Sequence, residues 1–191
     1  MKATVLNGCL DDQEFGNAFH ETVLAELASA GYNAIPYILR EEKIAPCMGC
    51  FVCWIKTPGI CVMDDAARRI AQDVVQSDVL IYITPVTFGG YSSELKKALD
   101  RNIPIILPFF QKIKGEIHHK ARYDHYPNLL VIGYLDKPNP EYEETFNFLA
   151  ERNALNMHNG KTLSEIFLKS DRKESIQARI EAALSKIGEG I

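Results

Sequence analysis

The chain has five cysteines, and four of them lie in one short segment with the spacing C-x2-C-x2-C-x7-C. These four are Cys47, Cys50, Cys53 and Cys61. In a reducing intracellular compartment such cysteines act as thiols, metal ligands or redox groups rather than as structural disulfides. Three thiolates at two-residue spacing with a fourth nearby converge well enough to hold a 4Fe-4S cluster. Zinc fits the spacing less well. Small buried thiols in a packed lid or dimer contact are the alternative to any metal.

A second segment whose residues are suited to binding a ligand is the glycine-rich turn TPVTFGGYSS, residues 84–93. Glycines let a backbone approach a flat ligand closely, and backbone N–H groups bind the carbonyls and ring nitrogens of such a ligand. Phe88 or Tyr91 can cover or edge a ring. The turn therefore predicts a site for a planar ligand, and an ordinary connection between a strand and a helix is the alternative.

The elements that must position these segments follow from hydrophobic periodicity. Apolar runs predict five strands, at residues 3–8, 33–39, 79–84, 128–135 and 162–168. Amphipathic patterns predict helices at about 17–30, after a cap at Asp64, at 94–102, at 141–153 and at 171–187. Gly31 is expected to end the first helix in a left-handed conformation. Asp171 and Glu174 are expected to form a capping box on the last one.

Strands that alternate with helices predict an α/β fold, a three-layer arrangement with a parallel sheet between helices. Five strands with right-handed crossovers favour the flavodoxin-like order 2-1-3-4-5. Ligands of such sheets bind at the carboxyl ends of the strands, which here are the loops after strands 1, 3 and 4. We expect residues 1–191 to form a single domain.

Composition and charge exclude several classes of protein. Lys and Arg total 21 against 25 Asp and Glu, which gives a net charge of −4 and a pI near 5.8. A nucleic-acid partner is not expected, because binding to phosphates favours a basic excess. The longest apolar stretches, 79–86 and 103–110, are well short of the roughly 20 residues that a membrane helix needs. The amino terminus runs quickly into acidic residues, unlike a signal peptide, so we expect a soluble cytoplasmic protein.

The run PVTFGGYSSELKKALDR resembles the flavin-contacting segment of the NADPH-dependent FMN reductase family. The cysteine segment with Asp64 and Asp65 is similar to the same family and to its relatives, the iron–sulfur flavoproteins. The resemblance implies a flavodoxin-like fold, noncovalent FMN and a homodimer or homotetramer. It implies that the isoalloxazine ring is lined by Pro85, Val86, Thr87, Phe88, Gly89, Gly90 and Tyr91. No catalytic acid or base is then required, because flavin N5 accepts the hydride.

The loop after the first strand departs from the family pattern. Members of the family carry a hydroxyl-rich, basic loop there, which holds the FMN phosphate. This chain has no Ser, Thr, Lys or Arg in residues 7–17, and it has three acids, Asp11, Asp12 and Glu14. The remaining candidates for the phosphate are backbone groups at Gly8 and Cys9 and the helix start expected at Asn17.

Three functions compete. The first is an FMN-dependent oxidoreductase that passes hydride from NAD(P)H to a quinone, a flavin or another small acceptor. The second is an electron carrier with FMN and a 4Fe-4S cluster that meets a protein partner. The third is a flavodoxin-like scaffold without flavin, which the acidic first loop favours. The basic stretch at residues 112–126 is expected to be a solvated loop, with NADPH phosphate binding or an oligomer contact as alternatives.

Overall fold

The computed structural model describes residues 1–10 and 14–190. A five-stranded parallel sheet forms its centre, in the order β2-β1-β3-β6-β7. The strands of this sheet are β1 (Lys2–Asn7), β2 (Asn33–Ile38), β3 (Val79–Pro85), β6 (Asn128–Leu135) and β7 (Thr162–Leu168). The helices are α1 (Glu14–Ser29), α2 (Val52–Ile55), α3 (Ala66–Val75), α4 (Ser93–Asp100), α5 (Pro140–Asn156) and α6 (Lys173–Gly188). Short 3-10 turns cover Leu39–Glu41 and Ile103–Ile105. The predicted strand order is confirmed.

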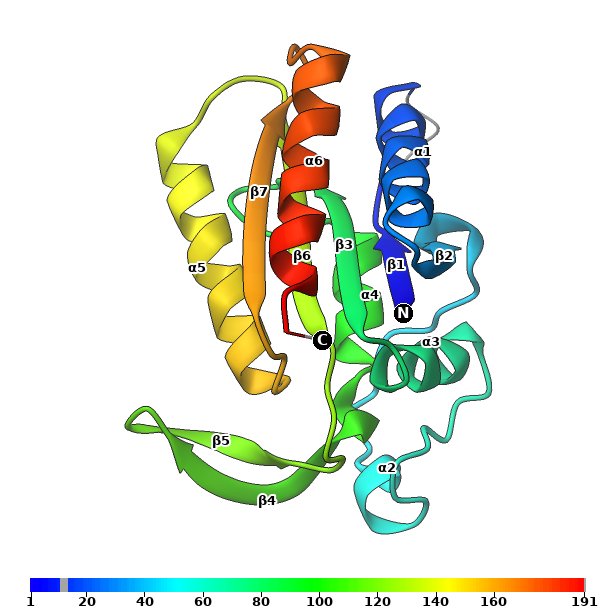
Figure 1. Cartoon of the computed structure of the whole chain (residues 1–191). Helices are drawn as coiled ribbons and strands as arrows, with labels where there is room; N and C mark the ends of the chain where they lie inside the picture. Colours follow the sequence, from blue (N-terminus) through cyan, green and yellow to red (C-terminus); the bar gives the residue numbers. More distant parts are fainter. Residues whose placement is uncertain (11–13, 191) are drawn as a thin grey trace.

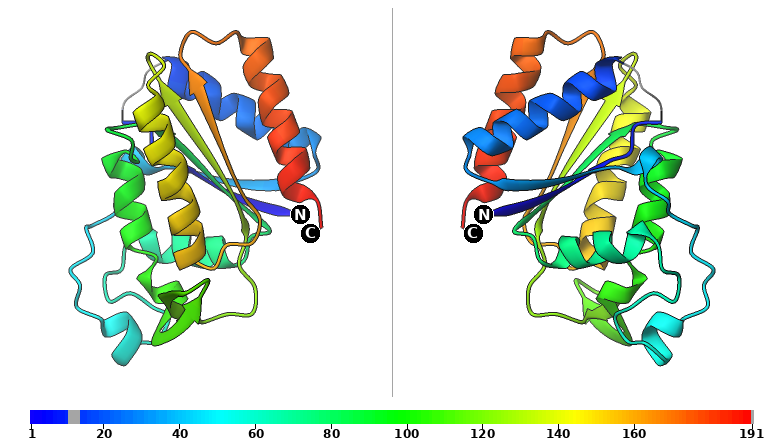
Figure 2. Two further views of the ribbon diagram at one scale, coloured as in Figure 1. Left: turned by 90° about the vertical axis from the view of Figure 1, so that its left-hand side faces the viewer. Right: turned by 90° about the vertical axis from the view of Figure 1, so that its right-hand side faces the viewer.

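Helices cover both faces of the sheet (Figures 1 and 2). Successive residues of β3 alternate between the two cores, as the period-two geometry of a strand requires. Val79, Ile81 and Ile83 pack against α1 and α6, whereas Leu80 and Tyr82 pack on the side of α3, α4 and α5. Because both faces are covered, this strand is apolar almost throughout, which is why it was readily predicted.

Several predicted boundaries are wrong for local reasons. Helix α1 begins at Glu14 rather than near Asn17, because the Phe15 ring packs against the Phe19 ring, with 5.6 Å between their centres, and extends the apolar face by one turn. Strand β3 continues through Pro85, which keeps its place opposite Tyr134 because a proline loses only its N–H. Gly31 is confirmed as the end of α1, with a φ of +78°.

Two predicted helix caps are also wrong. Asp65, not Asp64, caps α3, and its Oδ1 accepts a hydrogen bond of 3.1 Å from the Ala67 N–H. The capping box on α6 does not form, because Asp171 accepts from the Leu168 N–H at 3.0 Å and so closes the turn after β7. Asp64 instead pairs with Arg68 of α3 at 3.0 Å.

The largest departure from the prediction is the stretch expected to be a basic loop. It contributes to an antiparallel hairpin of β4 (Ile106–Ile113) and β5 (Glu116–Ala121). The hairpin projects from the body beside α2, at the end of the molecule opposite the loop that follows β1 (Figures 1 and 2). Its turn is made by Lys114 and Gly115, both with positive φ.

None of the described helices is long and apolar enough to cross a membrane.

Candidate functional site

The glycine-rich segment after β3 folds as a tight two-residue turn. The Thr87 N–H donates to the Gly90 carbonyl at 2.9 Å, and the Gly90 N–H donates to the Thr87 carbonyl at 2.8 Å. Between them, Phe88 and Gly89 adopt φ values of +50° and +75°. Two left-handed residues in succession are typical of a type I′ turn. A phenylalanine in this conformation is strained, which is a common property of ligand-binding turns.

The turn presents unused backbone donors at the carboxyl end of β3. Within the described residues, the N–H groups of Phe88, Gly89 and Tyr91 donate to no protein atom. The Phe88 side chain is 84% exposed. A pocket of about 260 Å3 lies beside the turn, and its lining includes Pro85 and Val86 and the loop after β6. Backbone donors beside an open pocket fit a flat ring that carries carbonyl and ring-nitrogen acceptors, so the donor set fits FMN.

Tyr91 does not present its ring to this pocket. Its side chain is 8% exposed and packs edge-on against Tyr82 and Phe146 in the core. Burial raises the pKa of Tyr91 to about 12, so its hydroxyl remains protonated. Of the two aromatic residues expected near the ring, only Phe88 offers its side chain. Tyr91 can contribute its backbone N–H alone.

The loop after β1 is held by its own contacts. The Gly8 N–H donates to the Ile83 carbonyl at 2.7 Å, and the Cys9 N–H donates to Asn7 Oδ1 at 2.9 Å. Gly8 is pressed against α4, where an added Cβ would lie 2.7 Å from Leu95 Cβ. The N–H groups of Gly8 and Cys9 therefore stabilise the loop and are not free to bind a phosphate. Asn17 lies inside α1 with an exposed side chain, and Asp11 and Asp12 are outside the described residues.

The four clustered cysteines line one common cavity of about 110 Å3. Cys53 is buried, Cys61 is half-buried, and Cys47 and Cys50 are exposed. In the described part of the chain, no three His, Cys, Asp or Glu side chains are close enough to hold a single metal ion. A 4Fe-4S cluster places its four thiolates on separate irons, so it needs convergence on a shared space rather than on one point. The cavity provides that convergence, and its donor set fits the cluster.

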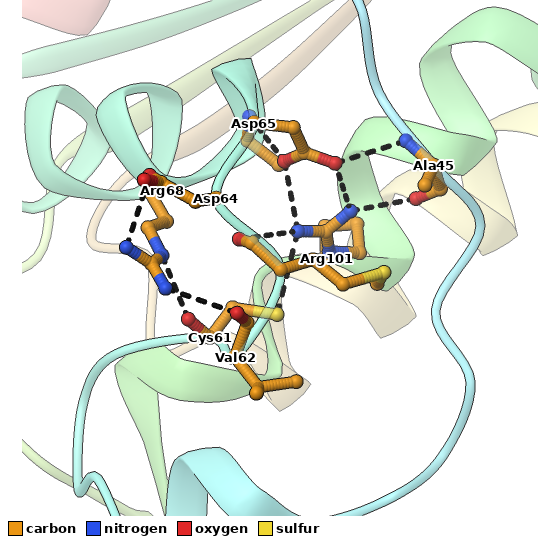
Figure 3. A network of polar contacts seen from close by, with 9 residues as sticks. Ala45, Cys61, Val62, Asp64, Asp65, Arg68 and Arg101 are labelled. Carbon is orange, nitrogen blue, oxygen red and sulfur yellow. Dashed lines mark hydrogen bonds and ion pairs between the residues drawn. The ribbon is translucent and has the colours of Figure 1, made fainter.

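A buried arginine closes the cysteine segment (Figure 3). Arg101 has a side chain only 1% exposed and binds both oxygens of Asp65, at 2.7 and 2.8 Å. The same guanidinium donates to the Ala45 carbonyl at 2.7 Å and to Cys61 Sγ at 3.3 Å. Asp65 accepts from the Ala45 N–H at 3.0 Å. The pair thus ties the chain before the first cysteine to the chain after the last one.

This ion pair is not predictable from the sequence. Arg101 and Asp65 are 36 positions apart, and neither lies at a helical spacing that points to the other. The family resemblance includes Asp65 and ends at Arg101 in the run PVTFGGYSSELKKALDR, but it does not indicate that the two residues pair. A buried pair of this kind has no local signature, because it is made by the packing of α3 against the end of α4.

The pH dependence of stability reports on Asp65. Burial alone raises the pKa of its carboxyl, but hydrogen bonds from Arg101, Ala45 and Ala67 outweigh burial and leave that pKa lowered. A carboxyl with a lowered pKa stabilises the fold above its unfolded value of 3.8 and loses this contribution as the pH falls further. We expect the free energy of unfolding to fall less steeply below about pH 4 in Asp65→Asn than in the wild type. Urea unfolding at several pH values measures this, and parallel curves would contradict it.

The two candidate sites lie at opposite ends of the sheet, and α4 runs between them (Figures 1 and 2). At its start, Ser92 Oγ donates to the Gly8 carbonyl at 2.5 Å. At its end, Arg101 holds Cys61. The hairpin lies at the cysteine end, so within one chain its lysines do not face a nicotinamide bound at the turn after β3. The site for NADPH phosphate that was considered there is not supported.

The largest cavity described, about 880 Å3, also lies at the cysteine end. It runs along α3 toward residues 123–125, and it shares Cys61, Arg101 and Pro104 with the cysteine cavity. Its volume alone does not make it the flavin site, because it is far from the unused donors of the turn after β3. Because Cys61 and Arg101 line both cavities, they lie between the large cavity and the cysteine cavity.

Comparison with known proteins agrees with this geometry. Residues 1–114 match the family model described as NADPH-dependent FMN reductase. An iron–sulfur flavoprotein of Methanocaldococcus jannaschii is 33% identical over 86 residues, which are 45% of this chain and 44% of that protein. An iron–sulfur flavoprotein of Archaeoglobus fulgidus is 30% identical over 106 residues, 54% of this chain and 46% of that protein. The matches thus span less than half the length of these curated relatives.

Solved structures share the fold across the whole chain. The NAD(P)H:quinone oxidoreductase of Methanothermobacter marburgensis has a TM-score of 0.70 and 14% identity, with 96% of each chain covered. An azoreductase of Bacillus anthracis has a TM-score of 0.67 and 10% identity, with both chains fully covered. At such identities the likeness concerns the flavodoxin-like fold alone. By its sequence match over residues 1–114, the chain belongs to the NADPH-dependent FMN reductase family.

Proposed function

We propose that this chain is an FMN-dependent oxidoreductase that takes hydride from NAD(P)H and passes it to a small acceptor such as a quinone or a flavin. The observation that carries the proposal is the turn at Phe88 and Gly89, whose N–H groups have no acceptor among the described residues and lie next to an open pocket lined by Pro85 and Val86. FMN, when bound, supplies the ring that accepts and releases the hydride. The chain's own residues bind and orient that ring.

Within residues 85–91 the protein contribution is position rather than proton transfer. Pro85 and Val86 form one wall of the pocket, and the Phe88 and Gly89 amides offer hydrogen bonds to ring acceptors. Burial raises the pKa of Tyr82 and Tyr91, so neither phenol acts as a base. The exposed Phe88 ring is placed to contact a flat nicotinamide. This agrees with a site that needs no catalytic acid or base of its own.

The first test is the absorption spectrum of protein purified without oxygen, followed by heat release of any cofactor. Two flavin bands with free FMN in the supernatant, and bleaching by NADH or NADPH, support the proposal. A protein that stays colourless after addition of FMN would leave the flavin-free scaffold as the function. If the holoprotein oxidises neither NADH nor NADPH, the proposed reductase activity is wrong, although the flavin site remains supported.

Phe88 offers a more specific test. In Phe88→Asn, asparagine tolerates the left-handed conformation, so we expect the apoprotein to keep its stability or gain about 1 kcal/mol. Loss of the exposed ring is expected to raise the KM for NAD(P)H severalfold, with FMN still bound through the backbone. Thermal unfolding and steady-state kinetics measure the two effects. A loss of stability together with an unchanged KM would contradict this role.

A second function is favoured by one observation, the convergence of four cysteines on a single cavity. The chain would then be an electron carrier with FMN and a 4Fe-4S cluster that serves a protein partner. Iron and sulfide near four per chain in anaerobic protein, lost in Cys50→Ala, would support it. Cys9→Ala is the matched control, since Cys9 lies outside the cavity and should leave the iron content unchanged. Iron-free protein would exclude the carrier.

We also infer a homodimer or homotetramer. Apolar side chains are exposed on α2 and the hairpin, where Ile55, Phe110 and Ile117 are 76, 63 and 75% exposed. Four rings form a continuous stripe on this surface, with Phe51 on Trp54, Trp54 beside His119, and His119 beside Phe110. Contiguous apolar patches are uncommon on monomers. Sedimentation of the purified chain measures the state, and a monomer would exclude this inference.

A further inference from the structure

The FMN phosphate needs positive charge and hydrogen-bond donors, and the loop after β1 supplies no cation. Residues 7–17 contain three acids and no Lys or Arg. The amides of Gly8 and Cys9 are already bound to protein acceptors. A phosphate at this end of the sheet must therefore draw its charge from another element.

Two kinds of donor remain around the start of α1. Asn7 is fully buried, its Oδ1 accepts from Cys9, and its Nδ2 has no partner among the described residues. Since both atoms belong to one carboxamide, the unpartnered nitrogen lies against the same loop. The first turn of α1, at Phe15 and Gly16, has N–H groups without helical acceptors and carries partial positive charge. These groups offer hydrogen bonds but no full charge.

Tyr134 connects this helix start to Lys169, which directly follows the neighbouring strand β7. Its hydroxyl donates to Cys9 Sγ at 3.3 Å, and its ring lies 5.4 Å from the Phe15 ring. A Cβ added to Gly16 would lie 3.7 Å from the same hydroxyl. On the other side, Lys169 Nζ lies 5.8 Å from the centre of the Tyr134 ring. One aromatic ring thus separates a cation from the amino end of α1.

Lys169 is held by its backbone at the carboxyl edge of the sheet, and its ammonium is paired there with a carboxylate. Its N–H donates to the Leu135 carbonyl at 2.9 Å, which fixes the backbone directly after β7. Its ammonium pairs with Asp136 at 2.7 Å, with the two side chains 32 and 78% exposed. An ion pair exposed to this degree contributes little free energy, so the ammonium can exchange a carboxylate for a phosphate. Lys169 also lines the pocket formed by Pro85 and Val86.

We propose that Lys169 contacts the FMN phosphate and replaces the basic residue that the first loop lacks. The inference rests on the proposed flavin function and goes beyond it by assigning the charge that distinguishes FMN from riboflavin. The ammonium supplies the charge, while Asn7 Nδ2 and the first turn of α1 supply hydrogen bonds. The phosphate site then needs no Lys or Arg in the loop after β1.

The test compares FMN with riboflavin, which has the same ring and no phosphate. Dissociation constants for both flavins are measured by fluorescence quenching for the wild type, Lys169→Ala and Lys169→Arg. We expect Lys169→Ala to weaken FMN binding about tenfold or more and to change riboflavin binding less than twofold. Lys169→Arg should retain most of the preference for FMN. Lys112→Ala is the matched control, because Lys112 is an exposed lysine of β4 at the opposite end of the molecule and should change neither constant.

A second variant works in the opposite direction. Asp136→Asn removes a carboxylate that pairs with Lys169, so we expect tighter FMN binding and unchanged riboflavin binding. Equal weakening of both flavins in Lys169→Ala would show a structural role and overturn the proposal, as would an unchanged FMN constant. Wild-type protein that binds riboflavin but shows no preference for FMN would overturn it while leaving the flavin function intact. Wild-type protein that binds neither flavin would overturn both.

Discussion

Arg101→Met is expected to lower the free energy of unfolding by about 3 to 5 kcal/mol. The substitution leaves the Asp65 carboxylate, which is only 9% exposed, without its cation. It also leaves the Ala45 carbonyl and Cys61 Sγ without the donors that they have in the wild type. Breaking one side of a buried pair costs far more than the pair contributes, because the surviving charge stays desolvated. Urea unfolding followed by circular dichroism measures the change.

The double variant separates loss of the charge from loss of packing. Asp65→Asn keeps an N-cap for α3, because asparagine caps helices about as well as aspartate does. Combined with Arg101→Met it removes the stranded charge, so we expect the double variant to be more stable than Arg101→Met alone. A double variant as unstable as the sum of the two single variants would show that charge is not the cause.

Gly89→Ala is expected to weaken FMN binding by at least about tenfold, which corresponds to 1.4 kcal/mol. Gly89 has a φ of +75°, where a Cβ is strained by roughly 1–2 kcal/mol. That Cβ would also lie 2.7 Å from Thr145 Cβ on α5. The turn must shift away from α5, and the Phe88 and Gly89 amides shift with it. Titration of apoprotein with FMN measures the affinity.

Gly90→Ala is the matched control. Gly90 adjoins the same turn but lies outside the left-handed region, and its added Cβ would meet no atom closer than 3.5 Å. We expect its FMN affinity to remain within about twofold of the wild type. The variant Gly89→Ala/Thr145→Ala relieves the clash but keeps the strain in φ, and it should recover only part of the affinity. Equal effects at Gly89 and Gly90 would contradict the role assigned to the turn.

The sheet could be predicted from the sequence because its physics is local. Strands covered on both faces are nearly continuous apolar runs, as in residues 128–135, whose predicted bounds match β6. Turn chemistry was equally readable at Gly31, which has the left-handed conformation expected of it. The glycine-rich turn after β3 is predictable for the same reason, since glycine permits the left-handed conformation that such a turn requires.

The hairpin could not be predicted because its pattern is broken. Pro108 interrupts β4, and the pairing with β5 shifts register between Ile106 and Phe110, so apolar and polar residues do not alternate. Its turn is Lys114-Gly115 rather than the usual Asn-Gly. The buried Arg101–Asp65 pair and the nearness of Lys169 to α1 depend on how elements pack, which no short window of sequence records.

The anchoring of α4 at both ends limits how the length of the chain can vary. One residue inserted between Ser92 and Arg101 would rotate everything beyond it by about 100°. Either the hydrogen bond from the Ser92 hydroxyl to the Gly8 carbonyl or the one from the Arg101 guanidinium to Cys61 Sγ would then be lost. The hairpin tip has no such constraint, because a Cβ at Gly115 would meet no atom within 4 Å. A reporter peptide is therefore best inserted at residues 114–115, and gaps among relatives should fall there rather than within α4.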